Sequence, residues 1–178
     1  WTDEICLKEN VYDEPHLRLT KGIHLTVERQ RFPIQQAIVM TTPIEKRILF
    51  AIPHPFFTFI GTTDTEFIGS LDRDVVATKE DLQYILKIVN HHMERLNLKV
   101  EDVKSTWAGV RPLIREDSKN ASSVSRDFKI HHHGYNLFTI YGGKLTTYRH
   151  MAKVVVSKII ESCFKNTTII SKTSKNAA

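Results

Sequence analysis

The sequence predicts an α+β fold, built on a mixed, mostly antiparallel sheet with flanking helices. Three observations lead to this class. Strand-like segments of alternating polarity are clustered in the first part of the chain, and about six strands are expected in all. Only two segments carry a sustained helical period. Short turn-like segments, rather than helices, connect the early strands.

The early strands are expected at residues 17–27, 37–41, 47–52 and 56–60, where polar and apolar side chains alternate or apolar residues run together. A hairpin-like connection at 42–46 contains Pro43, and the last of these strands runs into a turn at 61–65. This order of strands and short turns is typical of antiparallel pairing.

The clearest helix is expected from about Lys79 to Leu98. Thr78 is a favourable N-cap, and acidic residues occupy the first turn, where the helix dipole favours negative charge. Its apolar stripe has helical spacing and consists of Leu82, Ile85, Leu86, Val89, Met93 and Leu96. His91 and His92 lie partly off the stripe and are interpreted as solvated or half-buried.

The second half of the chain is expected to contain a polar loop at 115–122, a strand at 124–130, a turn at 131–134 and a partner strand at 136–141. A helix follows from about Leu145 to Phe164. Its expected apolar face is Tyr148, Met151, Ala152, Val155, Ile159 and Cys163. Residues 165–178 form a polar tail.

Composition restricts the class of protein. The chain has 178 residues, 41% of them hydrophobic and 25% charged, with a net charge of +5 and a pI of about 9.2. The charge is too small and too dispersed to indicate nucleic-acid binding by itself, and no apolar run reaches the roughly 18–20 residues that span a bilayer. Cys6 and Cys163 lack a CxxC spacing and are interpreted as reduced thiols of a cytosolic protein.

No metal site is expected, because consecutive residues of the tract 131–133 would point in different directions in a turn. The glycines form neither a GxGxxG nor a Walker pattern. The chain does not begin with methionine, so it is expected to be a segment of a longer protein.

The segment Tyr141-Gly142-Gly143-Lys144-Leu145-Thr146-Thr147-Tyr148-Arg149 predicts a tight turn between a strand and a helix. Two glycines permit positive φ angles and close approach of a ligand to the backbone. The free N–H groups of the helix start favour an anion or an electron-rich atom. Lys144 is therefore the strongest single candidate for a ligand contact, because a lysine at a helix start otherwise opposes the dipole.

Three further residues are candidates for a site. Arg111 precedes Pro112, which restricts it to extended conformations and suits it to a bidentate grip on phosphate or carboxylate; a surface ion pair is the alternative. Arg126 adjoins Asp127 in an expected strand, so it faces either a ligand or a structural partner. His24 lies within a strand, where it is either a base or phosphate donor, or a hydrogen-bonded core residue.

Five segments in this order resemble the FAD-dependent glycerol-3-phosphate dehydrogenases of the aerobic, quinone-linked kind, over about residues 1–164. They are Arg18-Leu19-Thr20-Lys21-Gly22-Ile23-His24-Leu25, Phe59-Ile60-Gly61-Thr62-Thr63-Asp64-Thr65, Thr106-Trp107-Ala108-Gly109-Val110-Arg111-Pro112-Leu113, Ser125-Arg126-Asp127 and the 142–149 turn. The resemblance implies a substrate-binding sheet at 1–135, as in flavoproteins like glucose oxidase and D-amino-acid oxidase. It also implies the final strand–turn–helix of the FAD domain at 136–164, before the tail at 165–178.

The resemblance also implies site roles. Gly142, Gly143, Lys144, Leu145, Thr146 and Thr147 would approach the pyrimidine edge of the flavin. His24, Arg111, Lys144 and Arg126 would bind glycerol 3-phosphate. His24, Arg111 and Lys144 would act in catalysis: His24 as candidate proton acceptor, Arg111 stabilising an alkoxide, and hydride passing from C2 to flavin N5.

The parent would then pass electrons to quinone, in the cytoplasm and peripherally at the inner face of the cell membrane. An oxygen-using oxidase of the same family and a non-catalytic phosphometabolite-binding module are the alternatives. Without the Gly-rich FAD motif, the chain alone is expected to be inactive, to bind little FAD and to self-associate through exposed apolar surface. No nucleic acid is expected as a partner.

Overall fold

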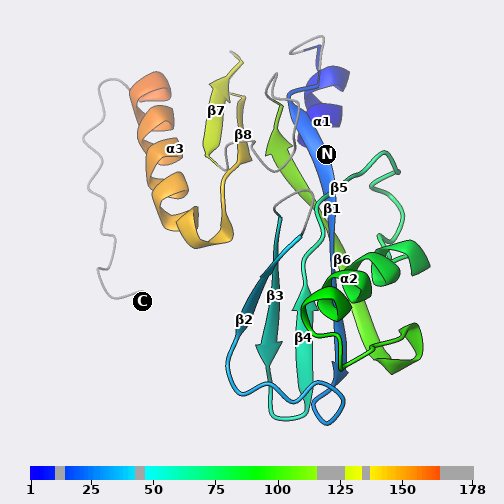
Figure 1. Cartoon of the computed structure of the whole chain (residues 1–178). Helices are drawn as coiled ribbons and strands as arrows, with labels where there is room; N and C mark the ends of the chain where they lie inside the picture. The colour runs from blue at the N-terminus through cyan, green and yellow to red at the C-terminus, as the bar shows by residue number, and fades with distance from the viewer. Residues whose placement is uncertain (11–14, 43–46, 116–126, 134–136, 165–178) are drawn as a thin grey trace. The chain divides into compact units, whose positions relative to one another are not determined.

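The computed structural model describes residues 1–10, 15–42, 47–115, 127–133 and 137–164. Every strand pairing among these residues is antiparallel, so the predicted α+β class with a mostly antiparallel sheet is confirmed (Figure 1). The chain divides into two compact units. The larger unit is Leu17–Val124, and the smaller combines Trp1–His16 with Ser125–Ala178. The assignment of functional domains from the sequence stays a prediction.

The larger unit is built around one long strand. Its strands are β1 (Leu17–Glu28), β2 (Ile38–Thr41), β3 (Ile48–Pro53), β4 (Phe57–Gly61), β5 (Thr65–Glu66) and β6 (Val103–Ile114). β6 pairs with β1 along its length, and β4 and β5 share the other edge of β1. β3 then pairs with β4, and β2 pairs with β3. The four early strands predicted from alternation are therefore confirmed to within about two residues.

Helix α2 (Lys79–His92) covers one face of this sheet (Figure 1). Thr78 caps it as predicted, and Asp81 completes a capping box. The prediction that the helix continues to residue 98 is wrong. Asn97 has a positive φ of 43°, and the Asn90 side chain bonds both backbone groups of Leu98, so the chain folds back after a short turn. A 3₁₀ turn, η1 (Val100–Asp102), then leads into β6.

The core lies between α2 and the sheet, because alternate strand residues point toward the helix. Its members are fully or almost fully buried: Ile23, Leu25, Val27, Phe32, Met40, Leu49, Ala51, Ile60, Ile85, Leu86, Ile88, Val89 and Leu98. Four of them belong to α2, so the predicted stripe is broadly right, although Ile88 was missed and Leu82 is only partly buried.

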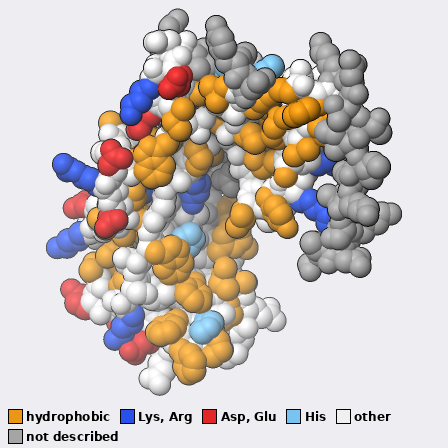
Figure 2. Space-filling model, turned by 180° about the vertical axis from the view of Figure 1, so that it is seen from behind, with side chains coloured by type: hydrophobic (Ala, Val, Ile, Leu, Met, Phe, Trp, Pro, Cys, Tyr) orange, Lys and Arg blue, Asp and Glu red, His pale blue; other side chains and the backbone are white. Residues whose placement is uncertain are grey.

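The opposite face of the sheet is open and rich in apolar side chains. Its exposed members come from four strands and are Val39, Ile48, Phe50, Ile52, Phe57 and Trp107. Figure 2, which shows the molecule from behind, has hydrophobic side chains gathered on this face with histidine side chains among them. The core-facing side carries the stability of the unit, and the open face is available for other contacts.

The smaller unit contains α1 (Thr2–Lys8), the hairpin β7 (Phe128–His132) and β8 (Phe138–Gly142), the 3₁₀ turn η3 (Leu145–Thr147) and α3 (Tyr148–Cys163). Sequence reasoning missed α1, whose seven residues are too few for a periodic pattern. His131 and His132 belong to β7, so the turn expected at 131–134 does not begin until after them. Residues 124–126 of that expected strand lie outside the described residues, as do 116–122 of the predicted loop.

The last helix begins later than predicted. Lys144 has an extended backbone, and η3 precedes the first α-helical residue, Tyr148. Val155 is buried, but Tyr148 and Ala152 are exposed, so the predicted apolar face is only partly correct. Cys6 and Cys163 are both free thiols, and the tail at 165–178 lies outside the described residues. Within the described part of the chain, no helix is both long and apolar enough to cross a membrane.

Candidate functional site

Arg111 lies on β6 with its guanidinium group directly over Gly22 of β1. Gly22 pairs with Gly109, and Arg111 pairs with Thr20, so the arginine side chain leans along the sheet by two residue pairs. A Cβ atom built on Gly22 would collide with the guanidinium nitrogens of Arg111. Gly22 is thus required for space, because any side chain there would displace the charged group.

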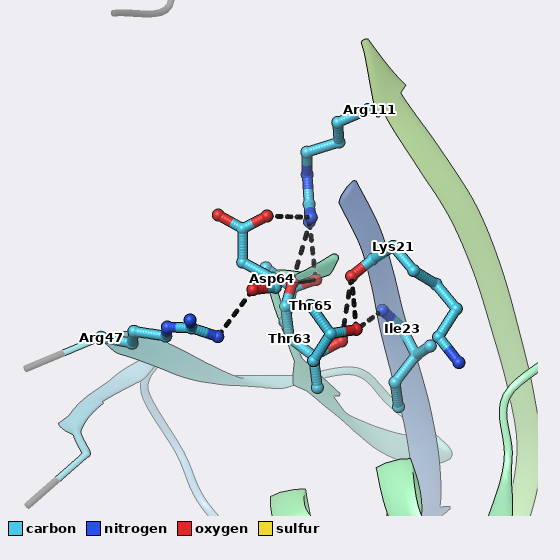
Figure 3. Close-up of polar contacts among 8 residues, drawn as sticks. Lys21, Ile23, Arg47, Thr63, Asp64, Thr65 and Arg111 are labelled. Atoms are coloured by element: carbon cyan, nitrogen blue, oxygen red, sulfur yellow. Dashed lines mark hydrogen bonds and ion pairs between the residues drawn. The ribbon is translucent and has the colours of Figure 1, made fainter. Parts of the chain in front are cut away.

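A turn following β4 holds this guanidinium in place (Figure 3). Arg111 Nη1 donates to the Thr63 carbonyl oxygen at 3.0 Å and contacts Asp64 Oδ1 at 3.4 Å, and Nη2 donates to Thr62 Oγ1 at 2.8 Å. The turn itself is bonded to β1 on both sides of Gly22. The Ile23 backbone N–H donates to Thr63 Oγ1 at 3.0 Å, and the Thr65 hydroxyl donates to the Lys21 carbonyl at 3.4 Å.

These bonds leave part of the arginine available. A guanidinium has five N–H donors, and the three contacts above use two on Nη1 and one on Nη2. The Nε hydrogen and one Nη2 hydrogen have no acceptor among the residues that the structure describes. With 29% of its side chain exposed, Arg111 can bind an oxyanion through these donors while the turn keeps it oriented. Of the two interpretations left open by the sequence, the ion pair is observed, and the grip on phosphate or carboxylate stays a prediction.

His24 lies two residues further along β1 than Gly22, on the same face. Its partners in register are Gly61 on β4 and Trp107 on β6. The imidazole occupies the space that a side chain at position 61 would need, since a Cβ there would lie 2.7 Å from His24 Cγ. On the other side, the indole of Trp107 stacks with the imidazole at a ring-centroid distance of 5.0 Å and an interplanar angle of 8°.

Burial, and then the positive charge of Arg111, lower the pKa of His24 below its ordinary value of 6.5. The imidazole is therefore neutral at neutral pH. Neither of its ring nitrogens forms a hydrogen bond with any residue in the described part of the chain. A neutral, half-buried imidazole with a free nitrogen can accept a proton, and no described residue forms the hydrogen bond that the alternative of a hydrogen-bonded core histidine requires.

The glycine–lysine turn belongs to the smaller unit. Gly142 and Gly143 have φ angles of 78° and 81°, so both positions require the left-handed freedom expected of glycine. The Gly143 N–H donates to the Asp127 carbonyl at 2.8 Å, which fixes the turn to the start of the hairpin. The side chain of Lys144 is exposed, and Thr147 Oγ1 donates to the Lys144 carbonyl at 2.9 Å.

This turn fits a negatively charged or electron-rich ligand edge. The first N–H groups of a helical turn have no acceptor within it, and η3 and α3 carry no acidic residue in their first turns. Leu145 is 89% exposed, and Thr146 is exposed as well. Lys144 N–H donates to Thr147 Oγ1 at 3.3 Å and Thr147 N–H donates to the Lys144 carbonyl at 2.9 Å, so the N–H groups of Leu145 and Thr146 are the ones with no acceptor among the described residues.

The predicted site residues are divided between the two units and the part of the chain outside the described residues. Arg126 lies outside the described residues, so its role stays a prediction. His24 and Arg111 are brought together on one sheet face of the larger unit, and Lys144 with the 142–147 turn belongs to the smaller unit. Among the described residues, no group of three or more His, Cys, Asp or Glu side chains is arranged to hold a metal ion.

Sequence reasoning missed the residues that orient the site. Thr62, Thr63 and Asp64 were identified only as a turn within a resembling segment, and Trp107 only as part of another such segment. The available signal was the position of glycine: Gly22 and Gly61 each lie in a strand, where glycine usually marks a close approach of another group.

Comparison with known proteins identifies the family of the chain. The chain belongs to the FAD dependent oxidoreductase family, whose model matches residues 1–157. Within that family it is similar to proteins named aerobic glycerol-3-phosphate dehydrogenase.

The relative from Staphylococcus haemolyticus (strain JCSC1435) is 43% identical over 156 residues, which cover 88% of this chain and 28% of the relative. The relative from Staphylococcus aureus (strain USA300) is 39% identical over 159 residues, covering 89% and 28%. A crystal structure of glycerol-3-phosphate dehydrogenase from Bacillus halodurans complexed with FAD matches with a TM-score of 0.77 at 38% identity. That match covers 90% of this chain and 30% of the other. The chain thus spans less than a third of the length of these relatives, and the resemblance found in the sequence is confirmed.

Proposed function

We propose that the chain is part of a flavoprotein that oxidises sn-glycerol 3-phosphate to dihydroxyacetone phosphate. The observation that carries this proposal is the juxtaposition of Arg111 and His24 on one sheet face, each lying over a glycine. An oriented guanidinium with free donors suits an anion or a developing alkoxide, and a neutral imidazole beside it suits proton abstraction. The relatives named above supply the substrate class.

FAD is the cofactor that the family and the glycine–lysine turn both support. Gly142 and Gly143 allow close approach, and the N–H groups of Leu145 and Thr146 would face the electron-rich pyrimidine edge of the flavin. When bound, FAD would supply the acceptor for the hydride that leaves C2 of the substrate.

The residues of this chain would do the remaining work. His24 would take the proton of the C2 hydroxyl, or alternatively contact the phosphate. Arg111 would stabilise negative charge on the C2 oxygen with its two free donors. Lys144, together with Arg126, would pair with the substrate phosphate, which carries about two negative charges near neutral pH. Loss of the proton and of the hydride converts the alcohol to the ketone.

The proposal extends to the electron acceptor and to location. Quinone is the proposed acceptor, with the parent protein in the cytoplasm, peripherally bound at the inner face of the cell membrane. The alternative is an oxidase of the same family that reduces oxygen. Hydrogen peroxide formed in step with glycerol 3-phosphate oxidation would favour the oxidase, whereas quinone reduction without peroxide would favour the dehydrogenase.

The decisive experiment is the Arg111→Ala substitution in the full-length protein, with Arg29→Ala as control. Arg29 is an arginine of the same unit whose bond to the His54 carbonyl is exposed. Arg111→Ala should lower kcat/KM for glycerol 3-phosphate by about 10²- to 10³-fold, the usual effect of removing one transition-state donor. Arg29→Ala should leave it unchanged. If both variants have the same kcat/KM, the assignment of Arg111 to the site is contradicted.

Calorimetric titration separates the proposal from the reading as a phosphometabolite-binding module. The full-length protein should bind glycerol 3-phosphate and FAD, and the 178-residue chain should bind neither well. Strong binding of glycerol 3-phosphate by the chain alone would favour the binding module. Self-association is also proposed, through the open sheet face, and a concentration-dependent mass in light scattering would support it.

A further inference from the structure

Beside the proposed site, Trp107 forms a parallel stack on His24. The ring centroids are 5.0 Å apart and the rings are inclined by only 8°. Trp107 is 45% exposed, so its contribution to the buried core is small. The indole lies on the open face of the sheet, beside the imidazole.

His24 lacks the contact that usually orients a histidine. In most sites a hydrogen bond to one ring nitrogen fixes the imidazole plane and tautomer. No described residue makes such a bond to His24. Its ring is instead confined between two neighbouring strands, by the stack on Trp107 and by close contact with the backbone of Gly61.

The tryptophan is itself held by a second aromatic ring. Phe59 on β4 meets the Trp107 indole edge-on, with centroids 5.8 Å apart and an interplanar angle of 75°. Edge-to-face and offset-stacked pairs of this kind contribute about 0.5–1.5 kcal/mol beyond area burial. Phe59, Trp107 and His24 therefore form one ordered aromatic row across three strands.

We infer that Trp107 is a positioning residue, which holds the imidazole of His24 in one plane above Gly61 so that a ring nitrogen is presented to substrate. This inference rests on the proposed function for the substrate and for the role of His24 as base, whereas the stack itself is a property of the chain. Arg111 is the charged group that acts on His24, and it lies on the same strand as Trp107, four residues further on.

The stack can be tested without substrate or FAD. The chain contains two tryptophans, so Trp1→Phe leaves Trp107 as the single indole reporter. A protonated imidazole stacked on indole quenches its fluorescence. The emission of the Trp1→Phe chain should therefore fall on acidification with a midpoint below pH 6.5, and His24→Gln should abolish this titration. If the emission does not change with pH, or changes equally after His24→Gln, the stack is not present in solution.

The positioning role is tested in the full-length enzyme with Trp107→Leu and Trp107→Phe. Trp107→Leu should lower kcat about tenfold or more with little change in KM, because a misplaced base impairs the chemical step more than binding. It should also move the acid limb of the kcat/KM profile toward pH 6.5, because the imidazole becomes more open to water. Trp107→Phe keeps a stacking ring and should restore most of the activity.

Phe57→Leu is the matched control, since Phe57 is an aromatic residue of the same face that contacts His54 and Phe56 rather than His24. A Trp107→Leu enzyme whose pH profile superimposes on that of the wild type, or whose loss of activity equals that of Phe57→Leu, would contradict the role. If the unmodified full-length protein does not oxidise glycerol 3-phosphate, the proposed function is contradicted. The fluorescence test of the stack is independent of that result.

Discussion

The guanidinium group of Arg111 occupies the space above Gly22 that any other residue would fill with its own side chain. Gly22 in turn pairs with Gly109, so two glycines face each other across β1 and β6. Only one of them is crowded: nothing lies within 4 Å of a Cβ atom built on Gly109. The pair offers a test in which two identical substitutions differ only in their effect on Arg111.

Gly22→Ala should displace the Arg111 side chain while the sheet stays intact. The colliding atoms are the far end of a flexible side chain, so we expect a change in unfolding free energy of at most about 1 kcal/mol. In the full-length protein kcat/KM for glycerol 3-phosphate should fall at least about tenfold, because a misplaced charge no longer meets the substrate. Gly109→Ala should be close to wild type in both thermal melting and kinetics. The interpretation fails if the two variants behave alike.

The strands of the larger unit were predictable because alternation is a local property. Each of β1 to β4 shows its buried and exposed faces within a few residues, and Thr78 and Asp81 mark the start of α2 in the same way. Where the signal was short or absent, as in α1 and the two-residue β5, prediction failed. The end of α2 was missed because Met93 and Leu96 continue the helical spacing from within a turn that still packs on the core.

The site was predictable only in part, for a related reason. Arg111 and His24 were identified from their local sequence, as a pre-proline arginine and a mid-strand histidine. What orients them comes from other strands: Trp107 is 83 residues from His24 in sequence, and Asp64 is 47 residues from Arg111. Such partners are set by strand register, and the pattern of a single segment does not contain the register of its neighbours.

Asp81 both caps α2 and forms an ion pair with Lys21 of β1. Removing its carboxylate should therefore lower the unfolding free energy strongly. The carboxylate accepts from the Thr78 N–H at 2.9 Å and pairs with Lys21, and the two side chains are only 9% and 15% exposed. Asp81→Ala should lower the unfolding free energy by about 3–5 kcal/mol, since it leaves a buried ammonium unpaired. Asp102→Ala, which opens the more exposed pair with Arg31, should cost about 1 kcal/mol. Urea unfolding of the chain measures both.

The same pair gives a pH dependence. Burial alone would raise the pKa of Asp81, but the hydrogen bonds from Lys21 and Thr78 hold it below the ordinary value of 3.8. The unfolded carboxyl therefore binds its proton at a higher pH than the folded one. The stabilisation is complete above about pH 4 and is lost as pH falls through the folded pKa. The difference between wild type and Asp81→Ala should shrink over that range. A difference independent of pH would show that packing, not charge, carries the effect.

The smaller unit should lose stability at a higher pH than the range in which Asp81 titrates. The reason is that a histidine cluster surrounds the Tyr141 hydroxyl. Tyr141 Oη lies 3.0 Å from His16 Nδ1 and 2.8 Å from His131 Nε2. Burial first, and then the charges of His16, His133, Lys129 and Lys158, lower the pKa of His131. Asp3 on α1 is the acidic group that faces Tyr141. Folding thus disfavours protonation of His131, and stability must fall as pH drops from 6.5 through the folded pKa.

Replacement of His131 by Gln should reduce this loss, since glutamine does not titrate and can still bond the Tyr141 hydroxyl. One titrating group changes the unfolding free energy by at most about 1.4 kcal/mol per pH unit. The variant should lack the contribution of His131 to this pH dependence. His132→Gln is the control, because His132 is exposed on the same strand and stacks on Phe138 instead. Hydrogen exchange of the β8 amides between pH 7 and 5 reports on this unit separately. Equal acid sensitivity in both variants would assign the effect to groups other than the Tyr141 cluster.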